Sequence, residues 1–149
     1  MEIVLFRHAK SSWDYPVADI HRPLNARGLR QSQQMAKNCQ LDKPARVLCS
    51  VASRAYATAL AYQQAGWFSA PQMTLHECLY FSPLEEVLAL ISTVTEEPLW
   101  IFGHNPQLET LAEYFTSQQI TLKTSCYVQL RTNALAQGCA SAVEQCSPQ

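Results

Sequence analysis

A run of four apolar residues that ends in an arginine and a histidine constrains the fold of this chain most. Residues 3–6 are continuously apolar, and Arg7 and His8 follow them directly. An unbroken apolar run of this length is typical of a strand that is covered on both faces, as in a parallel sheet. Such a strand would place a cation and a histidine together at its carboxyl end.

Two later apolar runs end in the same way. Residues 47–49 lead into Ser50, with Arg54 shortly after, and residues 99–102 lead through a glycine into His104. Open α/β sheets bind ligands outside the carboxyl ends of their strands. Two arginines and two histidines at one such edge predict an oxyanion site, and a phosphoryl group in particular.

Helical patterns alternate with these runs along the chain. Helices are expected after Asn25, near Ser53, over residues 84–94 and from Pro106, and further strands over residues 73–75 and 126–130, with an edge strand near residues 140–143. The alternation predicts one domain over residues 1–149 with an α/β fold. Its architecture would be three-layer α/β/α around a mostly parallel sheet, with right-handed crossovers.

Composition narrows the class of protein. Of 149 residues, 48% are hydrophobic and 15% charged, which indicates a globular chain with one sizeable core. The net charge of −1 leaves no basic surplus for binding nucleic acid, and no segment approaches a membrane span. The six cysteines lack metal-binding spacing, so free thiols are expected. The start of the chain lacks the basic region of a signal peptide, so a cytoplasmic protein is expected.

The residue types at the strand ends suit phosphoryl transfer. A neutral imidazole of His8 can attack phosphorus when a hydrogen bond on its other nitrogen fixes the tautomer. Arg7 and Arg54 offer planar, paired donors that match phosphoryl oxygens. His104 would donate a hydrogen bond to an oxygen on which charge builds in the transition state. Each residue alone could be structural, but their recurrence favours a common site.

Further residues are weaker candidates for the same site. Ser50 follows a strand and would contact the phosphoryl group. Asn105 would cap the helix that follows it and aim backbone N–H groups at the anion. Glu77 follows the third strand and is the best-placed carboxylate for a general acid, with Asp14 and Asp19 in reserve. No metal site is expected among these residues.

Three segments together resemble the histidine phosphatase superfamily. They are Arg7-His8, Ser50-x-x-x-Arg54-Ala55-x-x-Thr58 and Gly103-His104-Asn105-Pro106. A finer pattern is similar to the small SixA-type phosphohistidine phosphatases. It consists of residues 7–14 and of Arg22-Pro23-Leu24-Asn25-x-Arg27-Gly28. The resemblance covers residues 2–130, with Ala9 where the wider superfamily usually has glycine.

The resemblance implies a phosphoglycerate mutase-like fold and a covalent mechanism. His8 would attack phosphorus and become transiently phosphorylated, while Arg7, Arg54 and His104 hold the phosphoryl group. Water would then hydrolyse the phosphohistidine. Inorganic phosphate or another oxyanion would fit the site, and no metal or organic cofactor is implied.

The length of the chain bears on the substrate. Larger members carry inserted segments that roof the site and often supply an acid, and this chain has no room for such a lid. An open site suits phosphohistidine on a protein, such as a phosphotransfer domain, because imidazole, with a pKa of about 6.5, leaves without a strong acid. We therefore expect a protein phosphohistidine phosphatase. The alternatives are a small-molecule phosphomonoesterase of the same superfamily and a non-catalytic phosphate- or phosphoprotein-binding module.

Overall fold

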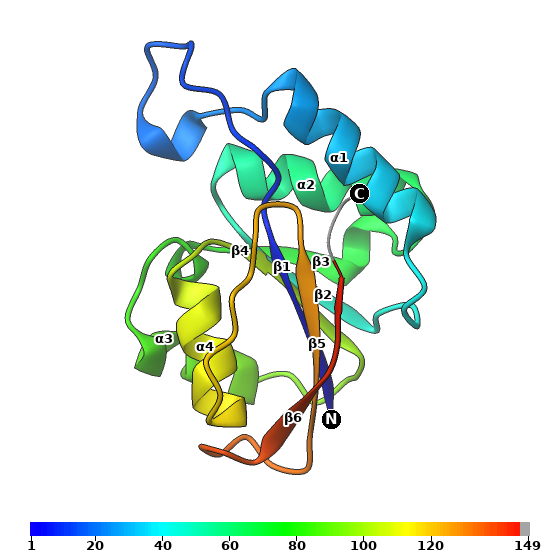
Figure 1. The fold of residues 1–149 in the computed structure, drawn as a ribbon, viewed down its shortest axis with the longest axis vertical. Coiled ribbons are helices and arrows are strands. Elements are labelled where there is room, and N and C mark those ends of the chain that lie inside the picture. Colours follow the sequence, from blue (N-terminus) through cyan, green and yellow to red (C-terminus); the bar gives the residue numbers. More distant parts are fainter. Residues whose placement is uncertain (147–149) are drawn as a thin grey trace.

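The computed structural model describes residues 1–146 and places a six-stranded sheet between two pairs of helices (Figure 1). The strands are β1 (Glu2–Arg7), β2 (Arg46–Ser50), β3 (Met73–His76), β4 (Leu99–Gly103), β5 (Tyr127–Thr132) and β6 (Ala140–Cys146). The helices are α1 (Ala26–Asn38), α2 (Ser53–Gln64), α3 (Leu84–Ser92) and α4 (Gln107–Thr116). Short 3₁₀ helices are η1 (Asp19–His21), η2 (Ala70–Gln72) and η3 (Glu77–Leu79).

The strand order β3-β2-β4-β1-β5-β6 confirms the predicted three-layer, mostly parallel fold. Strands β1 to β4 pair in parallel, whereas β5 and β6 return antiparallel beyond β1. Each predicted strand is present, and the edge strand expected near residues 140–143 lies within the longer β6. None of the helices in the described part of the chain is long and apolar enough to cross a membrane.

Unbroken apolar strands supply two cores at once, because successive side chains point to opposite faces of the sheet. On β1, Ile3 and Leu5 pack with α3 and α4, while Val4 and Phe6 pack with α1 and α2. Figure 1 shows the two helix pairs on opposite sides of the sheet. The apolar runs of the sequence therefore reflect burial on both faces.

The pairing of β1 with β4 brings their carboxyl ends together. Arg7 lies beside Gly103 in the register, and the backbone N–H of His8 donates to the carbonyl of Gly103 over 3.1 Å. Strand β2 pairs with the other side of β4, with Cys49 opposite Phe102. The residues that follow these strands consequently meet at one edge of the sheet.

The segment between β1 and α1 is folded back on itself beyond this edge. The backbone N–H of Ser12 donates to Pro23 over 2.8 Å, and that of Asn25 donates to Lys10 over 2.9 Å. Asn25 is the N-cap of α1, as predicted, because its side chain accepts from the N–H of Gly28 over 2.7 Å. At Gly28 the helix approaches the segment so closely that a Cβ would lie 2.1 Å from the Lys10 carbonyl oxygen.

This contact predicts an unusual effect for Gly28→Ala. Alanine within a helix is ordinarily favoured over glycine by about 1 kcal/mol. Here the added methyl group collides with backbone, so α1 or the segment after His8 must shift, and we expect a loss of roughly 1–3 kcal/mol in the free energy of unfolding, as for overpacked sites. Urea unfolding measures it. A variant more stable than the wild type would contradict the close approach.

Candidate active site

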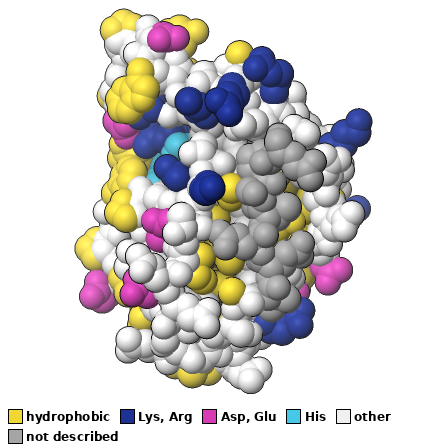
Figure 2. Space-filling model, viewed as in Figure 1, with side chains coloured by type: hydrophobic (Ala, Val, Ile, Leu, Met, Phe, Trp, Pro, Cys, Tyr) yellow, Lys and Arg dark blue, Asp and Glu magenta, His cyan; other side chains and the backbone are white. Residues whose placement is uncertain are grey.

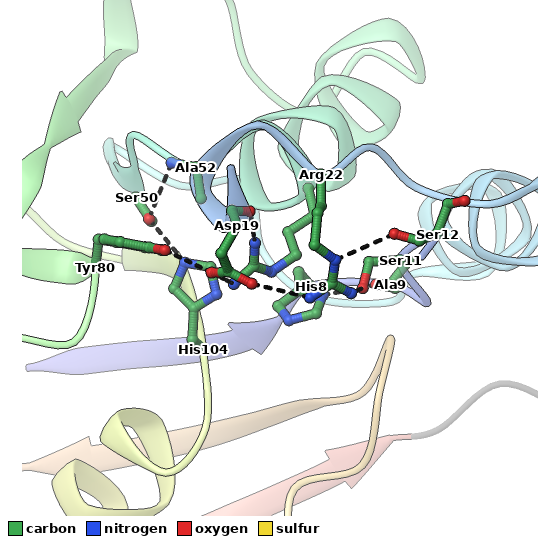
Figure 3. Close-up of polar contacts among 11 residues, drawn as sticks. His8, Ala9, Ser11, Ser12, Asp19, Arg22, Ser50, Ala52, Tyr80 and His104 are labelled. Atoms are coloured by element: carbon green, nitrogen blue, oxygen red, sulfur yellow. Dashed lines mark hydrogen bonds and ion pairs between the residues drawn. The ribbon is translucent and has the colours of Figure 1, made fainter. Parts of the chain in front are cut away.

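The two histidines and two arginines named from the sequence come together in the structure, and Figure 3 shows the two histidines. The rings of His8 and His104, which follow β1 and β4, have their centroids 5.1 Å apart. Arg7 is the last residue of β1, and Arg54 lies in the first turn of α2. The positive charges of both arginines act on both histidines. The predicted cluster of two histidines and two arginines therefore forms at the carboxyl edge of the sheet.

The geometry at His8 defines which ring nitrogen is reactive. Its Nδ1 lies 2.6 Å from the carbonyl oxygen of Ala9, and because a carbonyl only accepts, Nδ1 must carry the proton. The lone pair of the neutral ring is then on Nε2. Burial, reinforced by the charges of Arg54, Arg7 and Arg22, lowers the pKa of His8 to about 4 against the opposing effect of the Ala9 bond. His8 is thus a neutral imidazole with a nucleophilic Nε2 near neutral pH.

His104 forms a hydrogen bond with Ser50. Its Nε2 lies 2.8 Å from Ser50 Oγ, which also accepts the backbone N–H of Ala52. When Ser50 donates its hydroxyl hydrogen to His104 Nε2, the ring proton of His104 lies on Nδ1. Burial lowers the pKa of His104 to about 3, with the charge of Arg54 adding to the effect. Ser50 is fully buried and its hydroxyl positions His104, and its direct contact with a phosphoryl group stays a prediction.

Two buried nitrogen atoms of the cluster lack a hydrogen-bond partner among residues 1–146. They are Arg7 Nε and His104 Nδ1. Unpartnered buried donors are rare because leaving them unpaired costs on the order of 1–3 kcal/mol each. Arg7 itself is anchored by Nη1, which donates to the Leu122 carbonyl over 3.1 Å. Both free donors belong to side chains that surround His8, so this arrangement can accept an oxyanion.

Asp19 occupies the centre of a second network on the outer side of the cluster. Arg54 donates to its backbone carbonyl over 2.7 Å and to Oδ2 over 3.0 Å, and Arg22 donates to Oδ1 over 3.0 Å. Tyr80 donates its hydroxyl to the same carboxylate. Figure 3 shows Asp19 between Tyr80 and Arg22, with both histidines nearby. The Tyr80 bond, together with both arginines, holds the pKa of Asp19 well below its usual range, so Asp19 is a carboxylate anion.

Helix α2 fixes the backbone of this site through Thr58. Its Oγ1 accepts the N–H of Ala9 over 2.9 Å and donates to the Arg54 carbonyl over 2.8 Å. Arg54 and Thr58 lie one helical turn apart, so both face the end of β1. The spacing from Arg54 to Thr58 seen in the sequence therefore links the guanidinium to the segment that carries His8.

The structure contradicts the expected cap at Asn105 and shows no contact between the arginines and the acid candidates Glu77 and Asp14 within residues 1–146. Asn105 does not cap α4, whose N-cap is Pro106; its Nδ2 donates instead to the Leu122 carbonyl over 2.6 Å. Asn105 therefore secures the same carbonyl that anchors Arg7.

Glu77 lies in η3, is exposed, and forms no hydrogen bond or ion pair with the cluster within residues 1–146. Asp14 is exposed on the outer segment, and only Asp19 of the three carboxylates reaches the arginines.

Several contributors to the site carried little signal in the sequence. Arg22 stood out only within the motif shared with the SixA-type proteins, and it binds Asp19 while stacking on Trp13 at 3.3 Å. Tyr80 and Phe81 follow a short strand without any pattern, yet their rings lie 5.5 Å and 4.8 Å from that of His104. Only the folded arrangement of distant loops reveals these neighbours.

The lowered pKa values predict the titration of both histidines. In folded protein the imidazole NMR signals of His8 and His104 should keep their neutral positions down to about pH 5, whereas unfolded histidines take up protons near pH 6.5. Between about pH 6.5 and 4 the unfolded chain then binds more protons, so the free energy of unfolding should fall as the pH falls. A titration midpoint near 6.5 for His8 in the folded protein would contradict its burial among arginines.

Comparison with known proteins identifies the family and the fold. The family model of the histidine phosphatase superfamily (branch 1) matches residues 3–80. A structure from Agrobacterium tumefaciens, provisionally assigned as the phosphohistidine phosphatase SixA, is 24% identical with a TM-score of 0.82, covering 99% of this chain and 97% of that one. The protein histidine phosphatase SixA complexed with tungstate is 20% identical with a TM-score of 0.85, covering 99% and 97%. No curated protein matches the chain.

A second kind of phosphatase shares the fold at greater distance. The α-ribazole phosphatase from Shigella flexneri is 17% identical with a TM-score of 0.72, covering 96% of this chain and 95% of that one. These likenesses establish the fold. The family match spans just over half of the 149 residues and includes β1, with Arg7 and His8, and the first turn of α2, with Arg54. The chain belongs to the histidine phosphatase superfamily.

Proposed function

We propose that this protein is a phosphatase that hydrolyses phosphohistidine on another protein through a phosphorylated His8. The choice of substrate rests on the protonation state of the Asp19 carboxyl group. This carboxylate is ionised and already accepts hydrogen bonds from Arg22, Arg54 and Tyr80, so it has no proton to donate. The other acid candidate, Glu77, is exposed and unconnected to the cluster within the described residues.

The unpartnered donors support binding of the phosphoryl group. Arg7 Nε and His104 Nδ1 would bond its oxygens, and Arg54 would supply further N–H donors. Because these donors are held by Leu122, Ser50 and the Asp19 network, they need little rearrangement when charge develops on the oxygens. Preorganised donors of this kind lower the barrier of phosphoryl transfer.

The reaction would proceed in two displacements. His8 Nε2 attacks phosphorus of a substrate whose imidazole ring is protonated on its other nitrogen, the bond from phosphorus to that ring breaks, and the ring leaves as neutral imidazole with the electron pair of the broken bond. A water molecule then attacks the phosphoryl group on His8, loses its proton, and releases inorganic phosphate. His8 Nε2 recovers its lone pair, so the enzyme returns to its initial state. The Nδ1 bond to Ala9 keeps the ring orientation through both steps.

The leaving group explains why such a site can work without a positioned acid. Because imidazole has an unperturbed pKa of about 6.5, a phosphohistidine ring can already carry a proton near neutral pH and leave as neutral imidazole. An alkoxide expelled from a phosphate ester is far more basic and requires a general acid, whose contribution is typically about 10²–10⁴-fold. The absence of a proton-donating carboxyl next to His8 in the described structure thus favours a phosphoramidate over an ester.

Replacement of His8 tests the covalent step. His8→Ala should abolish turnover without unfolding the chain, because His8 follows β1 and lies outside both apolar cores. Brief exposure to labelled substrate should leave acid-labile phosphate on the wild type and none on this variant. His76→Ala is a matched control, since His76 ends β3 and bonds Thr74 instead of the cluster. Full activity in His8→Ala would refute the mechanism.

A side-by-side assay tests the substrate class. The wild type should hydrolyse a histidine-phosphorylated phosphotransfer domain at least about 10²-fold more efficiently than sugar phosphates or nucleotides. The reason is that ester hydrolysis here would lack a general acid, whose contribution is typically about 10²–10⁴-fold. Glu77→Gln should leave both rates within about tenfold of the wild type. Faster turnover of the small esters would identify a phosphomonoesterase instead. Tight oxyanion binding without any turnover would identify a binding module.

A further inference from the structure

Large apolar side chains are exposed on two separate segments at the mouth of the site. Trp13, Tyr15 and Val17 lie on the segment after His8, with exposed fractions of 78%, 60% and 46%. Phe81 is 47% exposed, and its backbone adopts a φ of 63°, which a bulky residue rarely takes. Apolar groups gathered in this way mark interaction surfaces in soluble proteins.

Four contacts in series connect Trp13 on the first segment with Phe81 on the second. Trp13 stacks on Arg22, and Arg22 binds Asp19. Asp19 in turn accepts the hydroxyl of Tyr80, whose ring lies 4.9 Å from that of Phe81. We call Trp13, Tyr15, Val17 and Phe81 the apolar rim. Its members Trp13 and Phe81 are tied to the same network that holds Arg54.

The other border of the site is positively charged. Lys10 is exposed two residues after His8. Lys123 is exposed beside Leu122, which accepts Arg7, and close to Ser125, whose N–H donates to the His8 carbonyl. Figure 2 shows histidine atoms at the surface with Lys and Arg side chains on one side and hydrophobic side chains on the other. The mouth of the site is thus apolar on one border and basic on the opposite one.

We propose that the apolar rim together with Lys10 and Lys123 is a docking surface for a folded protein that carries phosphohistidine between apolar and acidic side chains. This inference rests on the proposed function and adds the chemistry of the partner. Charge complementarity selects the occupant: the basic border would attract an acidic patch, while apolar contacts strengthen the complex. A membrane fits less well, because Asp14 and Asp19 lie within the apolar segment and would repel anionic lipid.

The docking surface predicts that substitutions within it affect the hydrolysis of a phosphorylated protein domain but not that of phosphoramidate, a small substrate. Tyr15→Ser with Val17→Ser should raise KM for a histidine-phosphorylated phosphotransfer domain by about tenfold, the effect of losing exposed anchor side chains, and leave turnover of phosphoramidate unchanged. Leu135→Ser is the matched control. Leu135 is exposed to 36% in the turn after β5, at the opposite end of the sheet, where the N–H of Thr132 bonds Met1.

A second pair of substitutions tests the basic border. Lys10→Glu with Lys123→Glu should raise KM for the phosphorylated domain and abolish its dependence on salt, since exposed charges act mainly on association. Lys43→Glu, an exposed change ahead of β2, is the control. Unchanged turnover of phosphoramidate in every variant verifies the fold.

The outcomes separate the two proposals. If the wild type hydrolyses both probes and the Tyr15/Val17 variant keeps the wild-type KM for the phosphorylated domain, the docking surface is wrong and the proposed function stands. If the wild type hydrolyses neither probe, the proposed function fails and the docking surface fails with it. Binding of the wild type to anionic lipid vesicles that the same variant loses would assign the apolar rim to a membrane and overturn the inference.

Discussion

The parallel pairing of β1 with β4 determines where both histidines lie. Both faces of β1 are apolar, so alternation of polarity alone does not specify its register. Side-chain packing does: Phe6 lies beside Phe102 in the register, and their rings are stacked with centroids 4.3 Å apart. This contact aligns the two strand ends, and the N–H of His8 then reaches the Gly103 carbonyl. The spacing of His8 and His104 is therefore a consequence of aromatic packing within the core.

Electrostatics within the cluster depend on that alignment. Two buried imidazoles are kept neutral because burial and neighbouring guanidinium groups both oppose protonation. Arg54 is itself 3% exposed, and a buried cation requires an anionic partner, which Asp19 supplies. A phosphoryl group carries about −1.5 to −2 charges and would bind the same guanidinium. The carboxylate thus orients Arg54 and limits the positive charge of the site.

Sequence reasoning reached the sheet and the inner cluster because both depend on local patterns. Apolar runs marked the strands, and Arg7, His8 and His104 were placed at one edge by the general geometry of parallel sheets. The outer network depends on how loops distant in sequence fold over that edge. Nothing near Tyr80 indicates that its hydroxyl meets Asp19, and Asn105 resembles a cap although its side chain secures Leu122 instead. The sequence pattern of β5 also does not indicate that this strand runs antiparallel to β1.

The segment between β1 and α1 connects the chemistry with the choice of substrate. Asp19 and Arg22 point inward to the cluster, while Tyr15 and Val17 of the same segment stay exposed. Displacement of water strengthens hydrogen bonds to a developing negative charge, and larger relatives are expected to achieve it with a lid. In this chain the exposed apolar side chains can exclude water only when another apolar surface covers them. Under the proposed function, a phosphohistidine on a folded protein would bring such a surface with it, whereas a small ester would not.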